Sequence, residues 1–572
     1  MLASNLSVLC TQHSALSSEH SVLSTQHSAL SSQHSALSTQ HCLLSTQHSA
    51  LFCQSSVLSS QSSALSTQHS ALFSQSSVLS SQSSALSTQH SALSSQHSAL
   101  SSQHSVLSPQ HSALSSCPDH LYSAQLVLSD VDTLIPRGAV RTHHGMITAV
   151  GRRADFPRKP DCPETDLGDV VLAPGLVNAH AHLEYSCCRG MLEPGPFVPW
   201  LRRMIEAKRG LEASAINSAM TEALRESVRG GVTCIGDVSS FGLSLFWLEQ
   251  SGLRYVVFHE VIGLAPPPYD ELLDDLERRI ARTPAGPRGR IGLAPHAPYT
   301  VSLPLMTALR ERFHAGKGMP FTIHIAETSS ERRCLRDQAG RLAALFRRIG
   351  FYDPAAGRDP ALLAASPMDF LAAGGPQTES PPDLLIHGND LTAAEMRILA
   401  GRSSPPTLVV CPGTRLFHTA RGPVLSRALR CGLPIALGAD SLASNDTLSI
   451  WVEMRRSIGL EKAWGPREAF AAATVGGARA LGLEGQIGVL RPGYRADFIA
   501  IVPPGAPKSP PLSPLSSVLC PLSSVLSPQS SVLSSSALLR FWLRPKTPPC
   551  VRGVWVNGEA ILQRPLFGES GD

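Results

Sequence analysis

Short apolar runs alternate with longer amphipathic segments between residues 175 and 437. The apolar runs have the length of buried strands, while the longer segments repeat apolar positions at helical spacing. Regular alternation of strand and helix predicts a parallel sheet, and eight such runs predict an α/β fold of the closed (β/α)8 TIM-barrel type. The expected strands are residues 175–179, 232–238, 255–262, 290–294, 321–325, 383–386, 407–410 and 434–437.

Further apolar runs flank this region on both sides. Residues 124–128, 138–140 and 146–151 precede it, and residues 496–501 and 551–558 follow it, with turn residues between them. We expect these strands to pair into a small β-sandwich. Residues 119–173 and 484–567 would form its two parts, and residues 174–483 would form the barrel.

Two segments have a different composition. Residues 7–118 repeat a heptad of Ser, Ala or Val, Leu, Gln and His, and half of the 22 histidines of the chain lie there. The repeat is almost uncharged and has few aromatic residues, so it cannot bury much core and we expect residues 1–118 to be disordered. The same unit returns near residues 517–533, and residues 504–549 would then be a long loop inside the sandwich.

Composition excludes several classes of protein. The formal net charge of +4 is too small and too scattered to indicate nucleic-acid binding. The 13 cysteines form no regular framework, which fits a reducing cytoplasm. No apolar run approaches the length that spans a membrane. We expect a cytoplasmic protein with a small-molecule partner, and the sequence leaves a homo-oligomer open.

The first apolar run of the predicted barrel ends in the sequence NAHAHLE, residues 178–184. Side chains at positions i and i+2 of a strand point the same way, so His180 and His182 can reach one metal ion. Polar residues also end later runs, where the active sites of such barrels lie. These residues are His296, His324 with Glu327, His387, and Asp440.

These motifs resemble those of the amidohydrolase superfamily, in its deaminase and chlorohydrolase branch. The resemblance rests on residues 178–184, 295–300, 324–327, 387–389 and 438–445, in that order. It implies a mononuclear metal site and a substrate contact from His296. The metal ligands that it implies are His180, His182, His324 and Asp440.

The residue types account for the expected chemistry. Three imidazoles and a carboxylate suit Zn²⁺, with Fe²⁺ as the alternative, and such a metal lowers the pKa of its water from 15.7 to about 7. Asp440 can accept a proton from that water, and Glu327 can pass a proton to the substrate. His387 would hold the attacking water or polarise the reacting carbon. The fourth predicted strand offers no Lys to bridge two metals, which favours one ion.

Residues 178–186 and 197–201 resemble the corresponding segments of aminodeoxyfutalosine deaminases. That resemblance implies hydrolytic deamination of aminodeoxyfutalosine on the futalosine route to menaquinone, with Glu184 and Trp200 near the nucleobase. Residues 411–418 depart from the usual motif after the seventh strand. Hydrolysis of guanine, an adenosine thioether or a chlorinated triazine remains an alternative. A non-catalytic scaffold is disfavoured because all four ligands and Glu327 are present.

Overall fold

The computed structural model describes residues 119–282, 285–315, 318–373, 384–420, 422–502, 534–543 and 549–562. The chain divides into two units, and nearly all of these residues belong to the unit that comprises residues 117–211 and 215–572. The expectations for the heptad region at residues 1–118, and for most of residues 504–549, lie outside the described residues.

All eight predicted barrel strands are present, each within two residues of the expected bounds. They form two four-stranded parallel sheets, in the orders β6-β7-β8-β9 and β10-β11-β12-β13. The strands are β6 (Leu176–Ala181), β7 (Val232–Ser239), β8 (Arg254–Val261), β9 (Gly289–Pro295), β10 (Thr322–Ile325), β11 (Leu384–His387), β12 (Thr407–Val410) and β13 (Ile435–Leu437).

The two sheets meet through single bridges and do not form one continuous closed ladder. Leu293 bridges Phe321 at one junction, and Ala181 bridges Asp440 at the other. Strands of three or four residues, such as β13 and β10, leave little length for a longer ladder. The fold is therefore TIM-barrel-like, and the closed barrel expected from the sequence is present as two halves joined at two seams.

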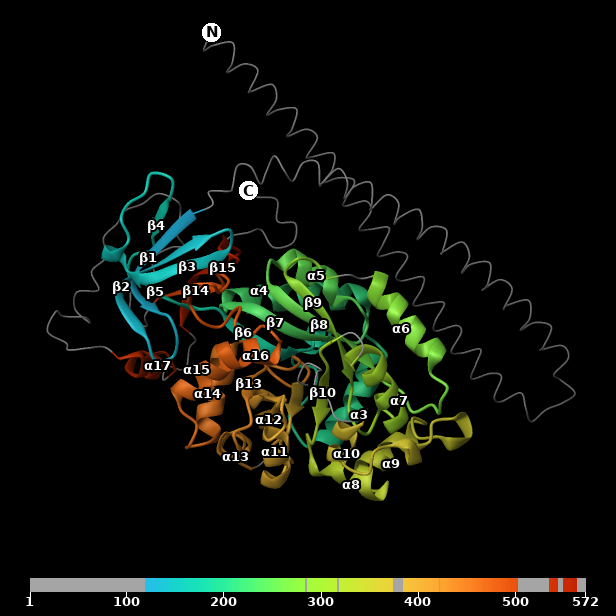
Figure 1. Ribbon diagram of the computed structural model, residues 1–572. Helices are drawn as coiled ribbons and strands as arrows, with labels where there is room; N and C mark the ends of the chain where they lie inside the picture. The colour runs from blue at the N-terminus through green and yellow to red at the C-terminus, as the bar shows by residue number, and fades with distance from the viewer. Residues whose placement is uncertain are drawn as a thin grey trace, which may run out of the picture. The chain divides into compact units, whose positions relative to one another are not determined.

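Helices follow the strands and surround them (Figure 1). Their apolar faces pack on the outer side of the strands, as Met220 and Leu224 do. The helices are α3 (Phe197–Lys208), α4 (Ala213–Arg229), α5 (Ser244–Ser251), α6 (Asp270–Arg282), α7 (Leu303–Leu309), α8 (Ser329–Asp337), α9 (Gly340–Arg348), α10 (Pro367–Ala372), α11 (Ala393–Ala400), α12 (Pro412–Phe417), α13 (Val424–Cys431), α14 (Ile450–Leu460), α15 (Pro466–Ala471) and α16 (Gly477–Ala480).

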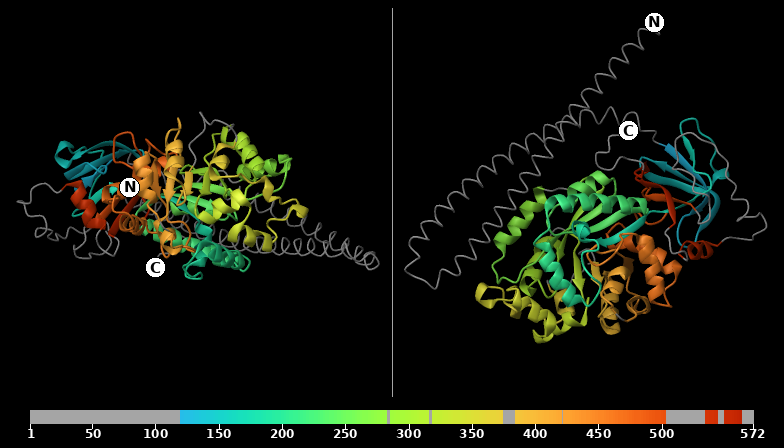
Figure 2. Two further views of the ribbon diagram at one scale, coloured as in Figure 1. Left: turned by 90° about the horizontal axis from the view of Figure 1, so that it is seen from below. Right: turned by 180° about the vertical axis from the view of Figure 1, so that it is seen from behind.

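The flanking strands form one eight-stranded mixed sheet, which differs from the expected two-sheet sandwich. Its order is β16-β15-β14-β5-β1-β2-β3, with β4 paired to β1. The first and last parts of the described chain lie together in it (Figure 2) because β14 pairs with β5. The strands are β1 (Asp119–Leu128), β2 (Leu134–His143), β3 (Met146–Arg152), β4 (Glu164–Asp166), β5 (Val171–Pro174), β14 (Phe498–Val502), β15 (Cys550–Val556) and β16 (Glu559–Ala560).

A long β1 explains the single sheet. Residues 121–123 of β1 pair with β4, while Leu126 and Val127 pair with β5 on the same edge. β14 then adds to the other edge of β5, so strands from both ends of the chain extend one hydrogen-bonded sheet. The expectation that both flanks of the barrel contribute strands is confirmed, whereas the division into two sheets is not.

Part of the segment expected to be a loop is helical. Residues Ser535–Leu543 form α17, and Leu538, Leu539 and Trp542 are buried in the main core. The ring of Trp542 lies 5.8 Å from that of Trp451 on α14. Burial of Trp542 stabilises this helix. The repeat-like sequence that precedes it did not predict a helix here.

A buried ion pair joins the barrel to the flanking sheet. Arg254 begins β8, and its guanidinium donates to both oxygens of Asp497 at 2.9 and 3.2 Å. Both side chains are almost fully buried. The carboxylate also accepts from the backbone N–H of Asn557 after β15, so one carboxylate connects three elements.

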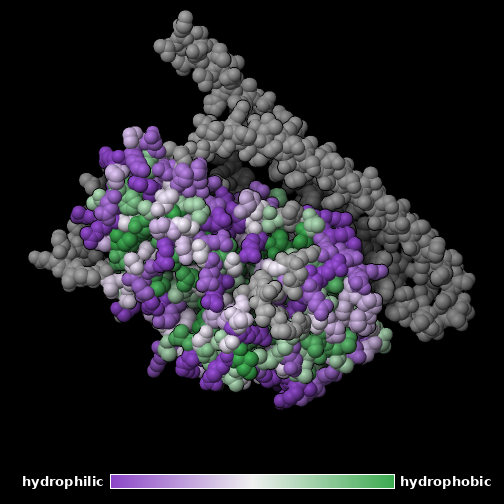
Figure 3. All heavy atoms as spheres, in the orientation of Figure 1, coloured by the Kyte–Doolittle hydropathy of each residue, from purple (hydrophilic) through white to green (hydrophobic). Residues whose placement is uncertain are grey.

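The surface carries both hydrophilic and hydrophobic residues. The face in Figure 3 shows hydrophilic residues interspersed with smaller hydrophobic groups over the described part of the chain. Within that part, no helix has both the length and the apolar character needed to cross a membrane.

Candidate metal centre and active site

His180 and His182 lie at the carboxyl end of β6. The adjacent Asn178 side chain accepts a hydrogen bond from the backbone N–H of Ala439 at 3.0 Å, which fixes β6 beside the segment that follows β13. Both histidines are buried, and their ring centroids lie 4.8 Å apart. The expected placement of both imidazoles on one side of the strand end is therefore present.

His324 on β10 joins this pair. Its Nε2 lies 3.1 Å from Nε2 of His182. Its Nδ1 lies 3.0 Å from the backbone carbonyl of His296. A carbonyl only accepts, so Nδ1 carries the proton and Nε2 presents a lone pair toward His182. This hydrogen bond sets the tautomer that a metal ligand needs.

Asp440 follows β13 and faces the histidines. Its Oδ1 lies 3.7 Å from Nε2 of both His180 and His182. Thr414 on α12 donates its hydroxyl to Oδ2 at 2.8 Å, and the backbone N–H of Ser441 donates to Oδ1 at 2.8 Å. These two donors hold the carboxylate in place. The sequence reasoning did not single out Thr414, although it lies in the atypical motif at residues 411–418.

The donor set fits a divalent transition metal. The nitrogen donors of His180, His182 and His324 lie within 4.8 Å of one another, and Nε2 of His180 has no hydrogen-bond partner among the described residues. Burial lowers the pKa of His182 to about 3 and that of His324 well below its usual value, so both imidazoles are neutral ligands. Burial acts to raise the pKa of Asp440, but the adjacent histidines hold it well below its ordinary range.

His387 lies beside the second oxygen of Asp440, and Glu327 lies next to His387. The His387 Nε2 atom is 3.7 Å from Oε1 of Glu327 and 3.8 Å from Oδ2 of Asp440. Burial, and then the charge of Asp440, raises the pKa of Glu327 well above its usual value. Burial lowers the pKa of His387 to about 3. A carboxyl with a raised pKa therefore faces a neutral imidazole and an ionised carboxylate, an arrangement suited to proton transfer.

Strained backbone accompanies these residues. Ala326, His387 and Asp440 have positive φ values of 47°, 72° and 59° at the ends of β10, β11 and β13. Such conformations cost about 1–3 kcal/mol each in residues other than glycine, and they cluster at functional sites. The carboxylate of Glu331 accepts from the backbone N–H groups of Ala326 and Glu327, which stabilises one of these bends. No motif in the sequence indicated Glu331.

His296 follows β9 with its ring 5.1 Å from that of His324. Its Nδ1 lies 2.7 Å from the hydroxyl of Thr300, and that hydroxyl donates to the carbonyl of Ala297. Nδ1 must therefore be the donor, which leaves Nε2 as an acceptor. This geometry does not test the substrate contact expected of His296, which remains a prediction.

Trp200 on α3 packs against protein. Its indole N–H donates to the carbonyl of Ala443 at 2.9 Å, and its ring lies 4.7 Å from that of His418. These contacts connect α3 with the segments after β12 and β13. A contact of Trp200 with substrate remains a prediction.

Glu184 is held by hydrogen bonds within the protein, and the substrate contact expected of it remains a prediction. It lies in the short 3-10 helix η2 (Leu183–Cys188), and its side chain is fully buried. Each carboxylate oxygen accepts two hydrogen bonds from the segment after β7, so its lone pairs are used within the protein. The donors are the hydroxyl of Ser239 and the backbone N–H groups of Ser240, Phe241 and Leu243.

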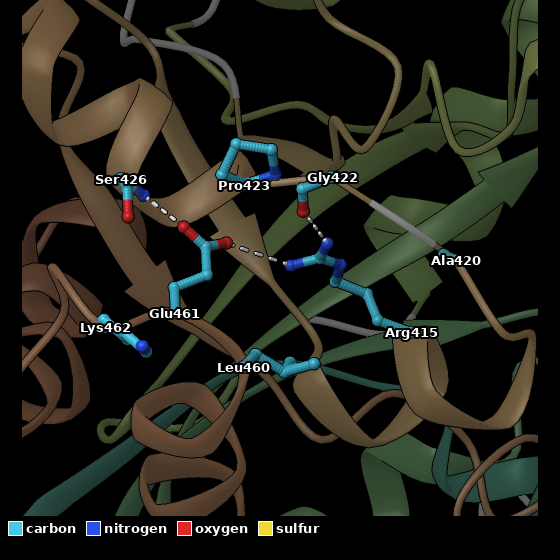
Figure 4. Close-up of a pocket in the computed structure, with 8 residues that line it drawn as sticks. All are labelled: Arg415, Ala420, Gly422, Pro423, Ser426, Leu460, Glu461 and Lys462. Carbon is cyan, nitrogen blue, oxygen red and sulfur yellow. Dashed lines mark hydrogen bonds and ion pairs between the residues drawn. The ribbon is translucent and has the colours of Figure 1, made fainter.

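The atypical motif at residues 411–418 is anchored by a second buried ion pair (Figure 4). Arg415 donates to Glu461 at 3.3 Å and to the carbonyl of Gly422. Glu461 also accepts from the backbone N–H groups of Leu425 and Ser426 at the start of α13. Arg415, Gly422, Ser426 and Glu461 line a pocket of about 420 Å³. Arg415 therefore fixes α12, which carries Thr414.

Comparison with known proteins places this site in a family. Residues 171–353 and 386–559 match the amidohydrolase family. A 5-methylthioadenosine/S-adenosylhomocysteine deaminase of Nitratidesulfovibrio vulgaris is 29% identical over 385 residues, covering 65% of this chain and 80% of the relative. The deaminase of the same name from Syntrophobacter fumaroxidans is 30% identical over 384 residues, covering 64% and 80%.

Solved structures share the fold. An adenosine deaminase of Xanthomonas campestris with bound zinc has a TM-score of 0.58 and 24% identity, covering 77% of this chain and 92% of the other. An aminofutalosine deaminase of Helicobacter pylori in complex with methylthio-coformycin has a TM-score of 0.62 and 19% identity, covering 77% and 99%. With the family match over most of the described chain and its deaminase relatives, this chain belongs to the amidohydrolase family and is a hydrolase of carbon–nitrogen bonds.

Proposed function

We propose that this protein is a metal-dependent hydrolytic deaminase of a 6-aminopurine nucleoside. The observation that carries the proposal is the convergence of His180, His182, His324 and Asp440 at strand ends, beside Glu327 and His387. Zn²⁺ is the proposed metal, with Fe²⁺ as the alternative, because both accept imidazole and carboxylate ligands. A bound ion would supply a nucleophilic water at neutral pH.

The side chains around the donor set account for the remaining steps. Asp440 accepts the proton that the attacking water loses, since its carboxylate is held ionised. Glu327, whose pKa is raised by burial and by the charge of Asp440, donates a proton to a ring nitrogen as water adds to the carbon that bears the amino group. Glu327, now a carboxylate, takes up the proton of the added hydroxyl group and transfers it to the amine as the carbon–nitrogen bond breaks and ammonia departs. The proton held by Asp440 then restores Glu327. His387, between the two carboxylates, orients the water.

The relatives support a nucleoside with a 5′ substituent. The two curated relatives described above act on adenosine thioethers according to their names. The sequence motifs favour aminodeoxyfutalosine, and the Helicobacter pylori structure shares only the fold at its level of identity. Both candidates present the same adenine ring to the metal centre. Menaquinone biosynthesis, a cytoplasmic location and a homo-oligomer remain predictions.

A substrate panel tests the proposal. Purified, metal-loaded protein would be assayed for ammonia release from adenosine, methylthioadenosine, S-adenosylhomocysteine, aminodeoxyfutalosine, guanine and a chlorotriazine. A preparation of His182→Ala made in the same way controls for contaminating deaminases. We expect the highest kcat/KM for an adenine nucleoside with a 5′ substituent. A preference for guanine or a triazine by about tenfold or more would contradict the nucleoside assignment and leave only the hydrolase mechanism.

A further inference from the structure

A second group of metal-binding side chains lies where three neighbouring strands end. β11, β12 and β13 are paired in parallel, so their carboxyl ends lie at one side of the sheet. His387 is the last residue of β11, Cys411 directly follows β12, and Asp440 follows β13. One potential ligand atom of each residue lies within 4.8 Å of the other two, and all three side chains are buried. The motifs in the sequence gave Cys411 no role.

Asp440 can belong to both groups because its two oxygens face different histidines. Oδ1 lies 3.7 Å from Nε2 of His180 and of His182, in the first metal centre. Oδ2 lies 3.8 Å from Nε2 of His387, in the second group. A carboxylate whose oxygens face two sets of donors can connect two cations, as in the two-metal sites of other hydrolytic enzymes.

Cys411 adds a sulfur ligand at a fixed position. It is fully buried and forms no disulfide. Its carbonyl accepts from the backbone N–H of Arg415 at 3.0 Å, and the N–H of Gly413 donates to the buried carboxylate of Glu453 at 2.7 Å. These bonds hold the start of α12, so the thiol stays beside His387 and Asp440. A thiolate is a soft ligand, and together with an imidazole and a carboxylate it suits Zn²⁺ and similar ions.

We propose that His387, Cys411 and Asp440 form a second cation site, which takes a soft divalent ion such as Zn²⁺ when that ion is in excess and thereby inhibits the enzyme. The thiol releases its proton to solvent as the sulfur–metal bond forms. With three protein donors, one of which must lose a proton, this site binds more weakly than the first centre with its four donors. The site is independent of the proposed function, whereas the inhibition rests on it.

Inhibition follows from what the second cation would do to the groups that move protons. It would take the lone pair of His387, which then cannot orient the water. It would also draw on the carboxylate of Asp440, which becomes a weaker proton acceptor. The Oε1 atom of Glu327 lies 3.7 Å from Nε2 of His387, so the positive charge would stabilise the ionised form of Glu327. An ionised Glu327 has no proton to donate to the ring nitrogen.

Cadmium is a probe that distinguishes the second site from the first. Full-length protein that holds one equivalent of Zn²⁺ would be titrated with Cd²⁺, because cadmium bound to a thiolate absorbs in the ultraviolet and the first centre has no cysteine. Bound zinc and cadmium would be counted by elemental analysis after gel filtration. Turnover would be measured on the best substrate of the panel. We expect the thiolate absorption and the inhibition to saturate together.

Cys411→Ser removes the soft donor with little change of volume. The variant should keep its zinc, bind about one equivalent of cadmium less than the wild type, and lose the corresponding absorption. Half-inhibition should need about tenfold more cadmium or higher, because a hydroxyl is a poor ligand for soft ions. Cys234→Ser is the matched control, since Cys234 is equally buried in the same apolar cluster. It should behave as the wild type, and thermal unfolding would be measured for both variants.

Each outcome decides the inference. Equal cadmium binding and equal absorption in the wild type and Cys411→Ser overturn the second site. Unchanged inhibition in that variant, or cadmium on Cys411 without loss of turnover, overturns the inhibitory role. If Cys411→Ser does not fold, the wild type decides alone, because inhibition that saturates without thiolate absorption overturns the inference. If no compound of the panel is deaminated, the proposed function fails, while cadmium binding and absorption still decide the site.

Discussion

The Nε2 atoms of His182 and His324 lie 3.1 Å apart, although the two residues are 142 positions apart in the sequence. Two imidazole nitrogens at this distance cannot both carry a proton, and the His296 carbonyl already places the proton of His324 on Nδ1. His182 can donate a hydrogen bond to His324, or, with its proton on Nδ1, present a second lone pair to a partner that both rings share. A divalent metal ion is such a partner.

Substitution of a ligand should remove the metal. We expect about one equivalent of a divalent transition metal in the wild-type protein, and His182→Ala and Asp440→Ala should each lose most of it because one of four donors is gone. Elemental analysis of the purified proteins is the measurement. His143→Ala, which changes an exposed histidine that pairs with Asp119 in the flanking sheet, should retain the metal. Undiminished metal in both ligand variants would contradict the assignment of the centre.

Glu327→Gln should separate catalysis from metal binding. The amide keeps the shape of the side chain but cannot transfer the proton, so kcat should fall by about 10²–10⁴ while metal content stays the same. Steady-state kinetics on the best substrate of the panel give the comparison. The matched control is Glu222→Gln on the exposed face of α4. Near-normal turnover would move the proton-transfer role to Asp440 or His387.

Arg254→Met should destabilise the protein strongly. It leaves Asp497 buried without its cation at the junction of the barrel and the flanking sheet, a change that costs about 3–5 kcal/mol. Chemical denaturation would measure the loss of unfolding free energy. Arg467→Met breaks an ion pair with Asp132 that is exposed to solvent, and we expect little change there. Similar losses of unfolding free energy in the two variants would show that burial does not determine how much an ion pair contributes to stability.

Asp237 should make stability depend on pH. Burial raises its pKa to about 7 in the folded protein, against about 3.9 in an unfolded chain. Between these values the folded state binds a proton that the unfolded state does not, so this contribution is complete below about pH 4 and is lost as pH rises toward 7. Its full size is on the order of 4 kcal/mol.

Asp237→Asn tests this dependence. The amide oxygen can still accept from the backbone N–H of Leu183, but the group no longer titrates. Denaturation at pH 5 and pH 8 should show a smaller loss of stability with rising pH in the variant than in the wild type. Asp275→Asn changes an exposed residue on α6 and should keep the wild-type slope. The same slope in Asp237→Asn would mean that this carboxyl does not titrate in the window.

The positions of the eight barrel strands, and of the polar residues that follow them, could be predicted from the apolar runs of the sequence. Strands that are buried on both faces have short, continuous apolar sequences, and the carboxyl ends of parallel strands lie at one side of the sheet. The ligand set of His180, His182, His324 and Asp440 was expected because the motifs resemble those of the amidohydrolase superfamily. The structure brings the three histidines within 4.8 Å of one another and Oδ1 of Asp440 to 3.7 Å from His180 and His182.

Tertiary structure alone decided which other carboxylates reach the site. The Glu184 carboxylate accepts from the Ser239 hydroxyl and from three backbone N–H groups, all more than fifty positions away, although Glu184 lies in the metal motif. Glu260, outside every motif, accepts from the hydroxyl of Ser240. Tertiary structure also decided that the flanks share one sheet and that Trp542 anchors a helix. Apolar periodicity records whether a residue is buried, but its hydrogen-bond partners depend on segments that only folding brings together.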